Sequence, residues 1–265
     1  MEREPGPSAA VSTMTSERPG KTIPAGFEKV VPGPGLTMMV AHGVDGVGLA
    51  SRILDPAGRV PARHFGRAGL HAVALADGGD ALVRSYRHGG WLRGLTRDWF
   101  ISRPPRPFAE LAVTAAARER GLATVEIVAA LVAHGVGPWY RGWLVTRELK
   151  GADTLWGALR GGIPVERMQV LLRRVGRTLR LMHEVGVEHA DLNLRNILVV
   201  HGTPAPEVYI IDFDKARLYP GHVPAARGRR NLRRLLRSVN KLDRERARIR
   251  PGDWDALLDA YRSHG

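Results

Sequence analysis

Hydrophobic residues recur with a helical period at several places along the chain. The clearest case lies between about residues 165 and 185, where one stripe is apolar and the arginines fall largely off it. The stripe consists of Met168, Leu171, Leu172, Val175, Leu179 and Met182. This spacing predicts a long amphipathic helix that packs one face against a core. Further helices are predicted at 152–160, 229–241 and 253–261.

The first half of the chain has a different pattern. Residues 81–84 place successive side chains on opposite faces, so that Leu82 and Arg84 share one side of a predicted strand. The other predicted strands are 125–133, 139–146 and irregular segments within 27–54, where Pro and Gly break the apolar runs.

One helix is predicted within this strand-rich part. It begins after a proline cluster near Pro107, keeps Phe108 and Leu111 on one face, and has Gly121 as its C-cap. Residues 1–25, by contrast, are rich in Pro, Gly, Ser and charge and show no apolar period, which predicts a disordered tail.

Composition narrows the possible locations and sites. The absence of cysteine among the 265 residues excludes disulfides and thiolate metal sites. No segment approaches the roughly 20 apolar residues of a membrane span, and the first residues lack the apolar core of a secretion signal. We therefore expect a protein that stays in the cytoplasm.

Positive charge is the main departure from average composition. The chain has 40 Lys and Arg against 26 Asp and Glu, a formal net charge of +14. Thirteen of the basic residues and only two acidic ones lie between residues 215 and 250. This balance predicts an anionic partner, either a nucleic acid, phospholipid head groups or a phosphorylated substrate. A genome of high GC content also raises the share of arginine and would produce part of the same excess of positive charge.

Two polar clusters carry the candidate chemistry. Asp191 and Asn196 lie five residues apart in a short loop, and Asp212 ends an apolar run sixteen residues later. If the two loops close on one cleft, carboxylate and amide oxygens meet there, and such ligands suit Mg²⁺ together with substrate phosphates. A single Asp/Asn pair is ordinary turn chemistry; a second motif at the right distance makes that interpretation much weaker.

The spacing H-x-D-x-x-x-x-N, followed by D-F-x, resembles the catalytic loop and metal motif of the eukaryotic-like kinases. The resemblance implies an α+β, protein-kinase-like fold with two lobes. The N-lobe, at 26–147, would be small and mostly β with one helix, and the C-lobe, at 148–265, larger and mostly helical. It also implies ATP and Mg²⁺ as cofactors, Asp191 as the catalytic base, and Asn196 and Asp212 as metal ligands.

Weaker motifs in the first part fit the same superfamily. Gly66 and Gly69 lie in a strand-turn-strand pattern whose backbone N–H groups could approach phosphates, although such glycine pairs occur in many hairpins. Arg84 is the candidate phosphate-clamping cation in place of the kinase Lys, with Arg87 as the alternative. Glu110 matches the helix glutamate that pairs with this cation, although acidic residues are common in a first helical turn.

The segment 146–151 is predicted to connect the two lobes. In this fold, backbone groups near Glu148 and Leu149 would meet the adenine edge of the nucleotide.

A narrower resemblance rests on three further features. They are Gly89-Gly90 with a basic and aromatic insert before R-x-F-A-E at 106–110, H-A-D-L-N-L-R-N-I-L at 189–198, and I-D-F-D-K-A-R at 211–217. Over about residues 60–240 the chain resembles the bacterial 3-deoxy-D-manno-octulosonic acid (Kdo) kinases and the related lipopolysaccharide core heptose kinases. These families phosphorylate a sugar hydroxyl of nascent lipopolysaccharide with ATP, and the last two motifs favour Kdo in Kdo-lipid A.

Departures from protein kinases favour a sugar acceptor. Asn193 stands where protein kinases carry a γ-phosphate Lys, with Arg195 as the candidate replacement. Asp214 replaces the Gly of D-F-G, which argues against a flipping activation loop. No A-P-E-like element follows, so no peptide platform is expected. The basic side of the 229–241 helix is a candidate docking surface for the phosphates and carboxylates of a lipid A precursor, or a solvated face.

The resemblance further implies a peripheral position on the cytoplasmic face of the inner membrane. Its implied partners are Kdo-lipid A and the anionic membrane surface, with no nucleic acid. Three alternatives stay open: a heptose kinase, an atypical kinase of the RIO or Bud32 type acting with RNA machinery, and an inactive kinase-like scaffold that binds lipopolysaccharide. His183 is expected to be structural, and His189 to brace the loop against the strand that precedes Asp212.

Overall fold

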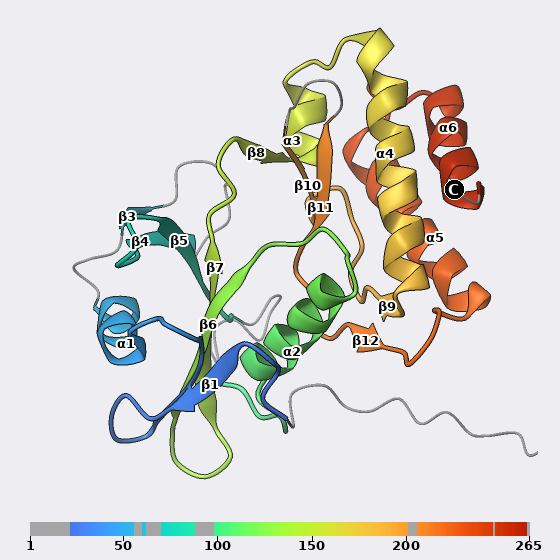
Figure 1. Ribbon diagram of the computed structural model, residues 1–265. Coiled ribbons are helices and arrows are strands. Elements are labelled where there is room, and N and C mark those ends of the chain that lie inside the picture. The colour runs from blue at the N-terminus through green and yellow to red at the C-terminus, as the bar shows by residue number, and fades with distance from the viewer. Residues whose placement is uncertain are drawn as a thin grey trace, which may run out of the picture.

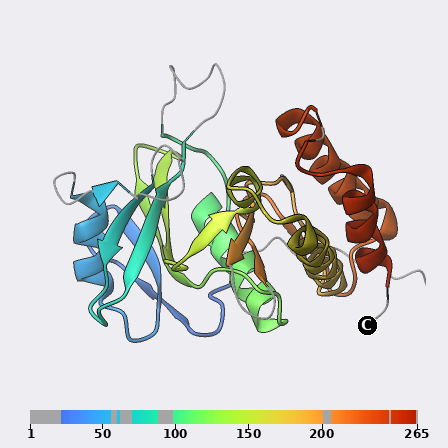
Figure 2. The same cartoon turned by 90° about the horizontal axis from the view of Figure 1, so that it is seen from above.

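The computed structural model describes residues 22–55, 60–61, 70–87, 98–200, 206–245 and 247–263. It divides into a sheet-rich part and a helical part that lie side by side (Figure 1, Figure 2). The predicted α+β fold, with one mostly β part and one mostly helical part, is confirmed. Residues 1–21 of the predicted tail, and the predicted phosphate-loop residues Gly66 and Gly69, lie outside the described residues.

Within the part of the chain that the structure describes, one antiparallel sheet of seven strands forms the sheet-rich part, in the order β1-β2-β6-β7-β5-β4-β3. The strands are β1 (Phe27–Val30), β2 (Leu36–Ala41), β3 (Val60–Pro61), β4 (Leu70–Ala74), β5 (Asp80–Ser85), β6 (Ile127–His134) and β7 (Tyr140–Arg147). The strands predicted at 81–84, 125–133 and 139–146 are confirmed. Because β5 is paired on both sides, with β4 and β7, Arg84 projects from a firmly held backbone.

Helices cover both faces of this sheet. α1 (Gly46–Leu54) packs Leu49 against one face, and α2 (Arg106–Glu119) packs Phe108 and Leu111 against the other (Figure 1). The strands predicted within 27–54 are confirmed by β1 and β2, but residues 46–54 form α1, so the prediction of a single helix in this part is wrong. Two glycines obscured the short period of α1, whose N-terminus is capped by a hydrogen bond from the Gly48 N–H to the Asp45 carboxylate (3.0 Å).

In the described residues from 152 onward, four helices and five short strands form the helical part. They are β8 (Ala152–Thr154), α3 (Leu155–Arg160), α4 (Val165–Glu184), β9 (Val187–Glu188), β10 (Ile197–Val200), β11 (Glu207–Ile210), β12 (Arg217–Leu218), α5 (Ala225–Leu242) and α6 (Pro251–Arg262). The four predicted helices are confirmed, except that the first three residues of 152–160 form β8. They extend to pair with β10, and Thr154 then caps α3 by accepting from the Gly157 N–H.

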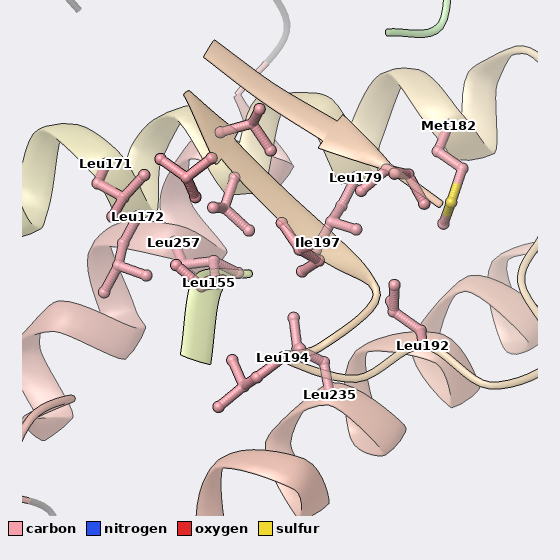
Figure 3. Close-up of a cluster of buried hydrophobic side chains, with 14 of the residues drawn as sticks. Leu155, Leu171, Leu172, Leu179, Met182, Leu192, Leu194, Ile197, Leu235 and Leu257 are labelled. Carbon is pink, nitrogen blue, oxygen red and sulfur yellow. The ribbon is translucent and has the colours of Figure 1, made fainter. Parts of the chain in front are cut away.

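The core of the helical part surrounds the loop between β9 and β10. Figure 3 shows side chains of α3, α4, α5, α6 and β10 converging with two leucines of that loop. The labelled residues are Leu155, Leu171, Leu172, Leu179, Met182, Leu192, Leu194, Ile197, Leu235 and Leu257. Within the described part of the chain, no helix is both long and apolar enough to cross a bilayer.

Candidate active site

The loop between β9 and β10 alternates between the core and the surface. Leu192 and Leu194 are fully buried (Figure 3), whereas Asp191 and Arg195 are exposed and Asn193 is half-buried. Because Leu192 and Leu194 anchor the loop in the core, the polar side chains that alternate with them face away from the core.

His189 braces this loop, as predicted. The backbone N–H of Asp191 donates to His189 Nδ1 (3.0 Å), so the ring proton must sit on Nε2, which donates to the carbonyl of Ile211 (3.0 Å). Burial lowers the pKa of His189, which favours the neutral ring that this pattern requires. The imidazole thus joins the backbone at Asp191 to the residue just before Asp212.

Asn231 of α5 holds the same loop from the other side. Its fully buried amide accepts from the His189 N–H (3.0 Å) and donates to the His189 carbonyl (2.8 Å). The same oxygen lies 3.1 Å from His183 Nε2, and His183 Nδ1 lies 2.8 Å from the Tyr261 hydroxyl of α6. The structural role expected for His183 is confirmed. Asn231 of α5 connects the loop to His183 of α4, and His183 connects it to Tyr261 of α6.

The two asparagines of the loop fix Asp191. Asn196 Nδ2 donates to the Asp191 carbonyl (2.8 Å), and Asn193 Nδ2 donates to the Asp191 carbonyl (2.9 Å) and carboxylate (3.2 Å). The Asn193 side-chain oxygen accepts from the Arg195 N–H (2.9 Å). These bonds orient the Asp191 carboxylate without covering it, because the residue stays exposed.

Arg84 joins the sheet-rich part to the strand end at Asp212. Its guanidinium donates to Asp212 Oδ1 (2.9 Å) and to Glu110 Oε2 (2.5 Å), and the buried Tyr86 hydroxyl also donates to Glu110. The predicted pairing of Glu110 with Arg84 is therefore confirmed. Asp212 adopts a left-handed backbone (φ +68°), a conformation that Asp tolerates better than most residues and that is common at functional sites.

Burial sets the electrostatics of this cluster. It raises the pKa of Glu110 to about 7, even though Arg84 lowers it, and it also raises the pKa of the Tyr86 phenol. The cluster therefore favours a neutral Glu110 until the pH nears neutrality, and it keeps Tyr86 protonated as a donor.

A second ion pair lies beside the first. Arg106, in the first turn of α2, donates through both Nε (3.0 Å) and Nη2 to the carboxylate of Asp214. Its guanidinium also stacks on Phe100, 4.8 Å from the ring centre. Asp214 is thus fixed by α2.

A narrow apolar slot opens between the two parts of the molecule. It is lined by Leu70, Leu82, Ile127, Leu144, Leu149, Leu198, Phe213 and the polar groups of Arg84, Glu110 and Asp212, among others. Of the two residues predicted near the adenine edge, Leu149 lines the slot and Glu148 does not. The backbone N–H of Glu148 donates to the Asp80 carbonyl (2.9 Å).

Two open cavities meet at the loop. The central cavity, of about 410 Å³, contains Arg84, Asp191, Asn196, Asp212 and Asp214 in its lining. A second cavity of about 590 Å³, here called the basic basin, is lined by the loop and by Arg234, Arg237, Ser238, Lys241 and Leu242. Asp191, Asn193 and Arg195 line both, so these three residues form the wall between them.

The donor set of the central cavity fits a hard cation. Asp212 supplies a carboxylate and Asn196 an amide at one cavity wall, and Mg²⁺ prefers such oxygen ligands. Among the described residues, however, no group of three or more carboxylate, imidazole or thiolate side chains could hold a metal alone. A cation here would therefore need phosphate oxygens from a nucleotide to complete its shell.

Three residues important to this geometry were not singled out as site residues from the sequence. Arg106 and Tyr86 complete the ion-pair cluster, and Asn231 holds the loop. A signal existed for two of them: Arg106 precedes Glu110 by one helical turn, and Asn231 is a polar residue on the apolar stripe of α5.

Comparisons with known proteins agree with this geometry. Residues 58–261 match the family model described as the lipopolysaccharide kinase (Kdo/WaaP) family. Over 177 residues the chain is 34% identical to the 3-deoxy-D-manno-octulosonic acid kinase of Xylella fastidiosa (strain M12). The matched region is 65% of this chain and 66% of that protein, so the chain spans just under two thirds of the length of this relative. A protein of the same name from Vibrio vulnificus (strain YJ016) is 36% identical over 191 residues, covering 69% of this chain and 75% of its own length.

Solved structures also match the chain. Among them, the structure of WaaP in complex with acyl carrier protein shares the fold, with a TM-score of 0.52 at 20% identity over 75% of this chain and 76% of that one.

Proposed function

Since the chain belongs to the lipopolysaccharide kinase (Kdo/WaaP) family, we propose that it transfers the γ-phosphate of ATP to a hydroxyl of Kdo in Kdo-lipid A. The curated relatives that it matches are named 3-deoxy-D-manno-octulosonic acid kinases, which makes Kdo the first acceptor to test. The reaction would add one phosphate to the sugar during assembly of the lipopolysaccharide core.

The observation that carries the proposal is the position of Asp191 between two cavities. On one side lies the central cavity with Arg84, Asn196 and Asp212, which suits nucleotide phosphates. On the other side lies the basic basin, which suits an anionic acceptor. A group transferred from one cavity to the other must pass Asp191.

The residues divide the chemistry between them. Asp191 accepts the proton of the acceptor hydroxyl while that oxygen forms a bond to the γ-phosphorus and the bond to the ADP oxygen breaks. Arg84, oriented by Glu110, binds the nucleotide phosphates. A Mg²⁺ ion held by Asn196, Asp212 and those phosphates would neutralise charge that develops on the transferred group.

The remaining assignments extend the same proposal. Leu149 and the apolar slot hold the adenine, and Arg195, at the wall between the cavities, supplies the positive charge that Asn193 lacks. The acceptor is a lipid, so the protein works at the cytoplasmic face of the inner membrane, where basic residues favour contact with anionic head groups.

Mass spectrometry of the reaction product tests the function. Kdo-lipid A incubated with the protein, ATP and Mg²⁺ is expected to gain one phosphate. Asp191→Asn should lower kcat by about 10²- to 10⁴-fold, with little change in the KM for ATP, and Asp212→Asn should raise the Mg²⁺ requirement.

Other outcomes identify the alternatives. Phosphorylation of a heptosylated core but not of Kdo-lipid A would identify a heptose kinase. Co-purifying RNA with a steeply salt-dependent affinity would instead favour an atypical kinase that acts on RNA machinery. Full function in cells with both Asp191 and Asp212 replaced would show a non-catalytic scaffold.

A further inference from the structure

We propose that the basic basin is a carboxylate-binding subsite that selects an acidic sugar and orients its hydroxyl toward Asp191. This inference rests on the proposed function and deepens it, because it names the acceptor group that is recognised. An octulosonic acid carries a carboxylate at neutral pH, whereas a heptose does not.

The cations of the basin come from one face of α5. Arg234, Arg237 and Lys241 follow the spacing i, i+3, i+7, which places them on one stripe of the helix. Arg195 adds a fourth positive charge from the loop. Among the described residues that line this cavity, Asp191 is the only carboxylate, so the charge balance favours an anion strongly.

Two of the basin residues are tied to the loop and fix its wall. Ser238 Oγ accepts from the Leu194 N–H (3.2 Å), and Arg234 Nη1 donates to the His189 carbonyl (3.3 Å). The basin therefore keeps a constant position relative to Asp191, because the same helix also holds His189 through Asn231.

Arg237 and Lys241 are the candidates for the anion contact. Both side chains are exposed, and among the residues that the structure describes neither has a carboxylate within ion-pair distance. They lie one helical turn apart, so a carboxylate can contact both. A cation that is buried, or already paired with a carboxylate of the protein, would not be available to contact the carboxylate of a substrate.

The charge arrangement also sets the direction of binding. The Asp191 carboxylate at one end of the basin repels an anion, and Arg237 and Lys241 at the α5 side attract it. An acidic sugar therefore places its carboxylate against α5 and a hydroxyl toward Asp191. A neutral sugar of similar size receives no such orientation, which makes the basin a specificity-determining element.

The test compares two substrates and two charge-matched variants. The substrates are Kdo-lipid A and the same lipid with the Kdo carboxylate converted to its methyl ester. The test variant is R237Q/K241Q, and the control is R173Q/R177Q. The two control arginines lie on α4, are exposed, have the same i, i+4 spacing and line neither cavity. Each variant loses two positive charges from a helix surface.

We expect the wild type to show a KM for the acid about 10- to 100-fold lower than for the ester, as loss of charge-assisted hydrogen bonds implies. R237Q/K241Q should raise the KM for the acid to that for the ester, and its kcat for the acid should also fall to that for the ester because the hydroxyl is no longer oriented. R173Q/R177Q should behave as the wild type. An unchanged KM in R237Q/K241Q overturns the inference. An equal rise for acid and ester also overturns it, since it would mean contact with lipid phosphates or the membrane surface.

A binding measurement separates failure of this inference from failure of the function. Calorimetry with soluble Kdo and its methyl ester needs no phosphoryl transfer. If the wild type forms no product but binds the acid in preference to the ester, and R237Q/K241Q loses that preference, the subsite stands and the proposed reaction falls. If product forms without any preference for the acid, the reaction stands and the subsite falls.

Discussion

Arg106 and Asp214 form a two-point ion pair between the first turn of α2 and the segment that follows the Asp212 strand end. Glu110 lies one turn further along α2 and pairs with Arg84, which also contacts Asp212. The helix is therefore attached twice to the same segment.

Replacing Arg106 should loosen this attachment. Arg106→Gln removes two hydrogen bonds to a charged group, each worth roughly 1.5–3 kcal/mol, and a cation–π contact with Phe100. We expect kcat/KM for ATP to fall about 10- to 100-fold and the free energy of unfolding to drop, as measured by steady-state kinetics and urea titration. Arg118→Gln, on the same helix, removes a surface pair with Glu126 (3.6 Å) and a hydrogen bond to the Thr124 carbonyl (3.3 Å), but no contact with Asp212 or Asp214, and should change little. Equal effects of the two variants would contradict the attachment.

The choice of Arg84 over Arg87 as phosphate-binding cation can be tested directly. Arg84 bridges Glu110 and Asp212, whereas Arg87 lies 3.9 Å from Asp98 at the edge of the cavity. Arg84→Gln is expected to reduce kcat/KM for ATP about 100-fold, and Arg84→Lys to restore only part of it, since an ammonium cannot bridge two carboxylates as a guanidinium does. Arg87→Gln should cost a few-fold at most. The reverse order of effects would assign the role to Arg87.

Glu110 should make stability depend on pH in a defined window. Burial raises its pKa to about 7 in the folded protein, compared with about 4.3 in an unfolded chain. The protonated carboxyl therefore stabilises the fold fully below pH 4.3, and this contribution is lost as the pH rises toward 7, at about 1.4 kcal/mol per pH unit. Glu110→Gln, which stays neutral, lacks this dependence.

Urea unfolding of wild type and Glu110→Gln at pH 5, 6, 7 and 8, without nucleotide or metal, measures the effect. The difference in unfolding free energy should shift in favour of the variant from pH 5 to 7 and level off above. Subtracting the two curves removes all other titrating groups and any constant effect of the substitution. A difference that does not vary with pH would show that Arg84 keeps Glu110 ionised throughout.

The hydrogen bonds of Asn231 predict a loss of activity from a distant residue. Asn231→Ala leaves the buried N–H of His189 without its partner, at about 1–3 kcal/mol, and leaves the His189 carbonyl with only the longer hydrogen bond from Arg234 (3.3 Å). We expect lower stability and a kcat about tenfold or more below the wild type with a nearly unchanged KM for ATP, because the loop shifts but the nucleotide contacts do not. Asn231→Asp, which keeps only the acceptor, should be intermediate. An unchanged kcat at reduced stability would limit Asn231 to a purely structural role.

The sequence predicted those parts of the site that lie within one motif. Asp191 and Asn196 share one loop, and Asp212 ends a nearby strand, so their meeting followed from spacing and resemblance. The pairing of Arg84 with Glu110 also followed from the resemblance. These residues come together because the fold of the superfamily brings their elements together, and each element has a clear period.

Partners supplied by distant elements could not be predicted in this way. Asn231 lies 42 residues beyond His189, and only the packing of α5 under the loop brings them together. Arg106 lies 108 residues before Asp214, which the sequence marked only as a missing glycine. β8 has a local pattern that favours a helix, and pairing with β10 overrides it. In each case a tertiary contact determines the local structure, and the local hydrophobic pattern does not predict that contact.

Gly176 links the packing of α4 to the loop between β9 and β10. A Cβ at this position would overlap the backbone carbonyl of Leu257 and lie 3.1 Å from the Ala260 Cβ, both on α6. Alanine normally stabilises a helix relative to glycine, but here overpacking should cost about 1–3 kcal/mol of unfolding free energy. Gly252→Ala, whose Cβ meets nothing within 4 Å, should be neutral or slightly stabilising. Because displaced α6 carries Tyr261, which contacts His183 (2.8 Å) beside Asn231, Gly176→Ala should also lower kcat. Urea unfolding and kinetics on both variants measure this, and a stable, fully active Gly176→Ala would show that α6 can move away without disturbing the loop.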